Sequence, residues 1–149
     1  MIRLFLDANV LFAAAWQEGK ARSLFFLAEK AGAQLLTSLH ALEEARRNLL
    51  LKRPDTEPLF QELSLRVTLV PEASARLVQQ ALKQGLPPKD APVLAAAWAA
   101  EADFLVTGDR KHFGPLMGRK VRGVWVLSLK EAWSLLLERA EGQGPSSGG

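Results

Sequence analysis

The chain has 149 residues, of which 48% are hydrophobic and 23% charged, and its net charge at pH 7 is +3, a composition typical of one ordinary globular domain. No apolar run approaches the roughly 18 residues that a membrane span needs, and the first run begins at Ile2, so we expect neither a membrane segment nor a cleavable signal peptide. The absence of cysteine excludes disulfides, thiolate metal sites and thiol catalysis, and it is typical of a cytoplasmic protein.

Short apolar runs alternate with stretches of helical spacing along the whole chain. The predicted strands are residues 2–6, 34–37, 67–70, 104–107 and 121–127. The predicted helices are residues 10–16, 21–31, 39–52, 72–84, 91–102 and 128–140, with a turn or two of helix at 59–63. Strands that alternate with helices are typical of a parallel sheet covered on both faces. We therefore predict an α/β fold of three layers, with helices on either side of a central parallel sheet of about five strands.

The predicted elements belong to one domain. Residues 1–141 contain no linker and no internal repeat, and they are enough for one hydrophobic core but not for two. The Gly-, Ser- and Pro-rich stretch 142–149 cannot bury apolar surface, so we expect it to be a flexible tail.

Acidic residues end two of the predicted strands and begin two of the predicted helices. Asp7 and Asp109 follow strands, Asp90 begins a helix, and Glu43 and Glu44 lie near the start of another. In a doubly wound sheet, the carboxyl ends of the strands meet the amino ends of the helices at one edge. Each aspartate alone could simply cap a helix, but carboxylates gathered at one edge repel one another unless a cation neutralises them. Mg²⁺ and Mn²⁺ prefer such oxygen ligands, so the pattern predicts a divalent-metal site.

The same segments resemble the PIN-domain nucleases over nearly all of residues 1–140. The resemblance is carried by the order and spacing of four pieces: Leu6-Asp7-Ala8-Asn9-Val10-Leu11; Thr37-Ser38 with Glu44-Ala45-Arg46; Asp90 with Leu94-Ala95-Ala96-Ala97; and Ala102-Asp103-Phe104-Leu105-Val106-Thr107-Gly108-Asp109 with His112-Phe113. It implies metal-dependent cleavage of RNA, often single-stranded. Many such nucleases are toxins of bacterial toxin–antitoxin pairs, and others act in RNA processing.

The resemblance implies one set of metal-binding and catalytic carboxylates: Asp7, Glu44, Asp90 and Asp109. Asn9 and Thr107 match neighbouring polar positions that orient a ligand or a water. Helical phase places Glu43 nearer the apolar face than Glu44, but the family pattern of a glutamate six residues after Ser38 selects Glu44. The implied chemistry is hydrolysis of a phosphodiester bond by a metal-activated water, with no covalent nucleophile.

Basic residues accompany the acidic ones. No acidic residue occurs from Arg110 to Lys130, and we predict that basic residues of this segment hold the RNA backbone: Arg110, Lys111, Arg119, Lys120 and Arg122. A second basic group is the alternative wall of the groove: Arg46, Arg47, Lys52 and Arg53. A solvated surface would have the same composition. The tryptophans, among them Trp16, fall on apolar faces, so core packing is expected and base stacking is a remote alternative.

The expected partners are RNA, an antitoxin protein and a second copy of the chain. The homodimer is predicted because the apolar residues, including Phe25, Phe26 and Phe60, exceed what one small sheet is expected to bury. Members of the resembled family also commonly pair.

Two other classes of protein fit part of the pattern. Asp7 with Thr107-Gly108-Asp109 also resembles the haloacid-dehalogenase-type phosphatases, which use the first aspartate as a covalent nucleophile. Their usual second aspartate is replaced here by Asn9. A non-catalytic RNA-binding protein could keep the same fold, although the intact carboxylates argue against this alternative.

Overall fold

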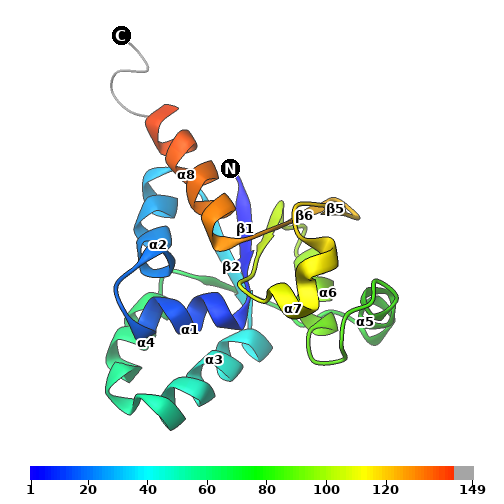
Figure 1. Ribbon diagram of the computed structural model, residues 1–149, viewed down its shortest axis with the longest axis horizontal. Coiled ribbons are helices and arrows are strands. Elements are labelled where there is room, and N and C mark those ends of the chain that lie inside the picture. The colour runs from blue at the N-terminus through cyan, green and yellow to red at the C-terminus, as the bar shows by residue number, and fades with distance from the viewer. Residues whose placement is uncertain (143–149) are drawn as a thin grey trace.

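A six-stranded sheet runs through the middle of the computed structural model, which describes residues 1–142 (Figure 1). Its strands are β1 (Arg3–Leu6), β2 (Gln34–Ser38), β3 (Thr68–Val70), β4 (Phe104–Val106), β5 (Lys120–Val121) and β6 (Val124–Leu127). Their order across the sheet is β3-β2-β1-β4-β6-β5, and every neighbouring pair is parallel except β5 and β6. The predicted α/β fold with a mostly parallel central sheet is therefore confirmed. Of the predicted tail, residues 143–149 lie outside the described residues.

Helices cover both faces of the sheet (Figure 1). They are α1 (Ala8–Trp16), α2 (Lys20–Lys30), α3 (Leu39–Lys52), α4 (Glu57–Ser64), α5 (Ala75–Leu82), α6 (Ala91–Ala99), α7 (Arg110–Phe113) and α8 (Leu129–Gly142). One core lies between the sheet and α1, α2, α3, α4 and α8, and a second lies between the sheet and α5, α6 and α7. The predicted three layers are thus present.

The central strands are apolar on both faces because both are covered. In β1, Leu4 and Leu6 point into the first core and Phe5 into the second, and all three are completely buried. This alternation explains why the sequence of β1 is an unbroken apolar run and does not alternate between polar and apolar residues.

The first strand, β1, pairs in parallel with β4. Leu6 lies opposite Val106 in the parallel ladder. The ladder continues beyond the strands, since the backbone N–H of Asp7 donates to the carbonyl of Val106 (3.0 Å) and that of Thr107 donates to the carbonyl of Leu127 (3.0 Å). The residues that follow β1 and β4 therefore lie side by side at one edge of the sheet.

One local prediction is wrong. The short helix α7 directly follows Asp109, and the single strand predicted at 121–127 is the antiparallel hairpin β5–β6. Arg122 and Gly123 form its turn with φ of 48° and 88°, the left-handed conformation that such tight turns require.

The apolar surplus is largely buried within one copy of the chain. Phe25 and Phe60 lie in the core, while Phe26 is 46% exposed. Leu51 and Leu65 are 78% and 88% exposed, so part of the surplus stays on the surface and the homodimer stays a prediction. Within residues 1–142, no helix combines the length and the apolar character that crossing a membrane requires.

Candidate active site

Asp7 lies at the carboxyl end of β1 and is the N-cap of α1. Its carboxylate accepts hydrogen bonds from the backbone N–H of Ala8 (2.8 Å), the Asn9 amide (3.2 Å) and the Thr107 hydroxyl (2.8 Å). Asn9 in turn accepts a hydrogen bond from the backbone N–H of Gly108 (2.8 Å). Asn9 and Thr107, predicted to orient a ligand or a water, therefore hold the Asp7 carboxylate in place.

The environment of Asp7 disfavours its negative charge. The side chain is buried, and this burial raises its pKa to about 6, although the hydrogen bonds from Thr107 and Ala8 oppose the rise. The negative charges of Asp90 and Glu44 contribute to this rise of the pKa. A buried carboxylate beside other carboxylates is the arrangement that a cation relieves.

Asp109 and Asp90 meet at His112. Asp109 caps α7 by accepting a hydrogen bond from the backbone N–H of His112 (3.0 Å), and its second oxygen lies 2.8 Å from His112 Nδ1. The same nitrogen lies 3.0 Å from Asp90 Oδ2. One ring N–H serves one acceptor well, and with Asp109 as that acceptor the buried Asp90 Oδ2 has no hydrogen bond of its own.

The pKa values of the two aspartates are shifted in opposite directions. Burial raises the pKa of Asp90, the charge of His112 opposes the rise, and the charge of Asp109 adds to it. Burial would also raise the pKa of Asp109, but the hydrogen bonds from His112 outweigh burial and lower that pKa. His112 thus supports the ionised form of Asp109 more than that of Asp90.

Glu44 reaches the same place from α3. This helix starts at the sheet edge because its N-cap, Ser38, ends β2 and accepts a hydrogen bond from the backbone N–H of Ala41 (3.2 Å). Glu44 lines the pocket with the aspartates, and its Oε1 lies 3.5 Å from Lys89 Nζ. Glu43 is exposed and faces a different hollow, between α3 and α4. The structure thus brings Glu44, and not Glu43, to the site.

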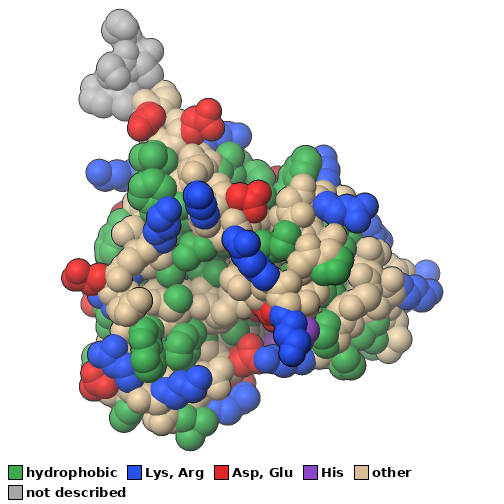
Figure 2. Space-filling view, viewed as in Figure 1, with side chains coloured by type: hydrophobic (Ala, Val, Ile, Leu, Met, Phe, Trp, Pro, Cys, Tyr) green, Lys and Arg blue, Asp and Glu red, His purple; other side chains and the backbone are tan. Residues whose placement is uncertain are grey.

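One open pocket of about 350 Å³ collects these side chains, and it is lined by Asp7, Ala8, Asn9, Phe12, Glu44, Asn48, Lys52, Lys89, Asp90, Gly108 and Asp109. Figure 2 shows acidic side chains in a hollow on this face, with basic side chains and a histidine beside them. The donor set fits a hard divalent cation, because it offers carboxylate oxygens and one of them, Asp90 Oδ2, is buried without a hydrogen bond. His112 adds a ring nitrogen within 4.8 Å of oxygens of Asp90 and Asp109.

The predicted basic residues divide into two groups. Arg110 and Lys111 directly follow Asp109 in α7. Lys120 pairs with Trp125 on β6, which pairs with Phe104 at the amino end of β4.

The turn that follows Lys120 therefore lies at the opposite edge of the sheet from Asp109. In that turn, the Arg122 guanidinium lies 4.6 Å from the centroid of the Trp98 ring and donates to Gln80. The structure does not bring Arg122 to the pocket.

Several side chains of the site were not identified from the sequence. His112 entered the sequence analysis only as part of the resemblance and without a role in the site. Phe12, Asn48 and Lys89 carried no signal in the sequence, since their places depend on how α1, α3 and the loop before α6 pack together.

Comparisons with known proteins agree with this architecture. The family model described as "PIN domain" matches residues 3–111, a range that includes all four carboxylates. The structure of PAE2754 from Pyrobaculum aerophilum is 20% identical, with a TM-score of 0.63 over 94% of this chain and 98% of that one. No curated protein sequence is similar enough to this chain to count as a match.

Two further structures are similar in fold. VapC20 from Mycobacterium tuberculosis, described as a sarcin-ricin loop cleaving toxin, is 17% identical, with a TM-score of 0.58 over 75% of this chain and 94% of that one. VapBC2 from Rickettsia felis, solved with a DNA fragment from its promoter, is 16% identical, with a TM-score of 0.63 over 85% of this chain and 98% of that one. At these identities the likeness shows the fold alone.

Proposed function

The chain belongs to the PIN-domain family of nucleases, and we propose that it is a metal-dependent endoribonuclease that cuts mainly single-stranded RNA. The observation that carries the proposal is the convergence of Asp7, Glu44, Asp90 and Asp109 on one open pocket. Carboxylates around an open pocket suit Mg²⁺ or Mn²⁺, which keep exchangeable waters when few of their ligands come from the protein. Membership of the PIN-domain family also argues against the alternative of a haloacid-dehalogenase-type phosphatase.

In this proposal the four carboxylates hold the metal. When bound, divalent ions position a phosphate oxygen, lower the pKa of a water and stabilise the leaving oxygen. The chain's own residues prepare the site: Thr107 and Asn9 fix the Asp7 carboxylate, and His112 fixes that of Asp109. Lys89, whose Nζ lies 3.5 Å from Glu44 Oε1, supplies a positive charge at the rim.

We also propose that the described chain acts as one nuclease domain and has an antitoxin protein as its partner. The partner is supported by the fold likeness to VapC20, a toxin, and to the VapBC2 complex. The predicted contacts of Arg110 and Lys111 with the RNA backbone remain part of the proposal, because both residues adjoin Asp109. The position of Arg122 does not favour a contact near the scissile phosphate.

The proposal is tested with an end-labelled pool of single-stranded RNA of random sequence. We expect internal cleavage in Mn²⁺ or Mg²⁺ and none in EDTA. Asp7→Asn should abolish cleavage, whereas Asp55→Asn, which removes a carboxylate 72% exposed and outside the pocket, should not. Cleavage by the Asp7→Asn variant at the parent rate would refute the metal assignment. Binding without any cleavage would support the non-catalytic alternative.

A further inference from the structure

Two rows of side chains lead away from the carboxylates along neighbouring helices. The row on α1 is Asn9, Phe12 and Trp16, and the row on α3 is Glu44, Asn48 and Lys52. Residues three or four apart share one face of a helix, so each row forms a continuous stripe. All of these residues except Trp16 line the pocket, and α1 packs against α3. The pocket therefore extends from the carboxylates between the two stripes.

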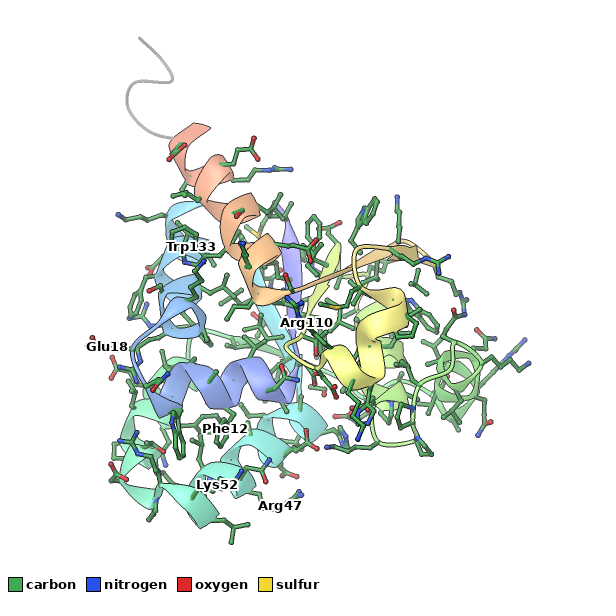
Figure 3. The ribbon with its side chains drawn as sticks, viewed as in Figure 1. Phe12, Glu18, Arg47, Lys52, Arg110 and Trp133 are labelled. Carbon is green, nitrogen blue, oxygen red and sulfur yellow. The ribbon has the colours of Figure 1, made fainter. Side chains whose placement is uncertain are left out.

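Aromatic and basic groups alternate at the far end of this pocket. The Phe12 and Trp16 rings stack, with centroids 5.2 Å apart and planes inclined by 21°. Lys52 Nζ lies 5.5 Å from the centroid of the Phe12 ring. Arg53 Cζ lies 5.1 Å from that of Trp16, and its guanidinium also donates to the Trp16 carbonyl (2.6 Å). Figure 3 shows Phe12 between α1 and α3, with Lys52 on α3.

Core packing alone does not explain this arrangement. Phe12 and Trp16 are only partly buried, and Phe12 opens on the pocket that holds the carboxylates. Aromatic rings that accept bases, set beside cations that hold phosphates, are the means by which proteins bind single-stranded nucleic acid without reading its sequence. The cations over these rings also attract the phosphates of a strand bound there.

We propose that Phe12, Trp16 and Lys52 form a nucleotide subsite beside the metal-binding pocket. An unpaired base of the RNA stacks on the aromatic pair, and the Lys52 ammonium leaves the Phe12 ring to hold an adjacent phosphate. The inference rests on the proposed function, since it takes the bound strand to be the nuclease substrate.

The dimensions of the groove suit a short stretch of strand. From Asn9 to Trp16 is about 10 Å along the helix axis at 1.5 Å per residue, or about three base steps of 3.4 Å. The stacked base thus lies within about three nucleotides of the phosphate at the carboxylates. Because a ring stacks on any base that is free of a partner, the subsite selects an unpaired strand rather than a sequence.

The first test compares two labelled probes, octauridylate and an octamer of the same ribose-phosphate backbone without bases. Binding is measured by fluorescence anisotropy in EDTA, in an Asp7→Asn background that should not cleave. Phe12→Leu should weaken binding of octauridylate by about 5- to 150-fold, the loss expected for one stacked base, and leave the base-free octamer unchanged. The matched control is Phe26→Leu, because Phe26 also lies under a cation, with Arg66 Cζ 4.8 Å from its centroid, but outside the pocket. Equal losses for the two probes, or for the two variants, would overturn the subsite.

The second test measures the dependence of octauridylate affinity on salt. Lys52→Gln should flatten the slope of log affinity against log salt by about 0.7, as one lost phosphate contact on a single strand does. Arg66→Gln, the control, should not change it. Lys52 is exposed, so this test holds even if Phe12→Leu does not fold. An unchanged slope would remove Lys52 from the subsite.

The two proposals fail in different ways. RNA cleavage in Mn²⁺ with no effect of Phe12→Leu on octauridylate binding would overturn the subsite and leave the nuclease standing. Binding that depends on Phe12, without cleavage of any RNA in Mn²⁺ by the unsubstituted chain, would overturn the nuclease and leave the nucleotide subsite standing. A chain that neither binds nor cleaves would overturn both.

Discussion

Replacing Asp7 by Asn should change how the stability of the metal-free protein depends on pH. Burial raises the pKa of Asp7 from 3.8 to about 6. At about 1.4 kcal/mol per pKa unit, ionising this carboxylate costs the folded protein about 3 kcal/mol relative to the unfolded chain. The folded state holds the Asp7 proton more tightly than the unfolded chain does. The protonated carboxyl therefore adds about 3 kcal/mol to the free energy of unfolding below pH 3.8, and this contribution is lost as pH rises to about 6.

Asparagine does not titrate, so the free energy of unfolding of the variant should rise relative to that of the parent as pH rises. The hydrogen bonds from Asn9 and Thr107 to Asp7 will also change, but that effect is nearly independent of pH and leaves the slope intact. The assay is urea unfolding in EDTA at intervals from about pH 4 to 7.5. The difference in unfolding free energy between Asp7→Asn and the parent should grow by about 2.5 kcal/mol over this range. Asp55→Asn is the control, and parallel curves for parent and Asp7→Asn would refute the reasoning.

Four further predictions concern the same protein. Mn²⁺ at about 100 times its Kd should raise the unfolding free energy by about 2.7 kcal/mol in urea titrations, and Asp90→Asn should largely remove this gain. Unlike Asp7→Asn, Asp109→Asn should lower the free energy of unfolding at pH 7 by about 1 kcal/mol, because it weakens the hydrogen bonds from His112 that lower the pKa of Asp109. This loss should fade below pH 3.8, which acid unfolding of both proteins would show. Ser38→Ala should cost about 1 kcal/mol by removing the cap of α3, measured by thermal unfolding. Phe113→Ala should cost about 3–5 kcal/mol, since the ring is completely buried, and a loss below about 1 kcal/mol in urea would contradict its packing.

The parts of the fold that were predictable are those set by local periodicity. Helix α3 has the bounds expected from its spacing of leucines after Ser38, and β1 was visible as an apolar run. The hairpin turn was not predictable, because Arg122 adopts a left-handed conformation that favours glycine. Its guanidinium is placed there by Trp98, which comes from a helix that precedes the turn by many residues.

Only the part of the candidate site that lies at the ends of parallel strands was predictable. The strand pattern predicts that Asp7 and Asp109 lie at the same edge of a parallel sheet, but only the structure shows that β1 and β4 are neighbours and bring the two residues side by side. Helical phase pointed to Glu43, whereas Glu44 lines the pocket, because a residue in the early turns of α3 reaches the rim from the side of the helix. The contact of His112 with Asp90 joins two elements that no sequence pattern relates.

The pairing of β1 with β4 also sets when the pocket can form during translation. The Thr107 hydroxyl that holds Asp7 comes from 100 residues farther along the chain, and the backbone N–H of Thr107 is itself bonded to Leu127. At about 5–20 residues per second, Asp7 waits roughly 5–20 s on the ribosome before its partner is made. A nascent chain therefore carries Asp7 and Glu44 for most of its synthesis without an assembled centre. The hydrogen bonds that hold Asp7 in the pocket are therefore complete only after β6 has been made.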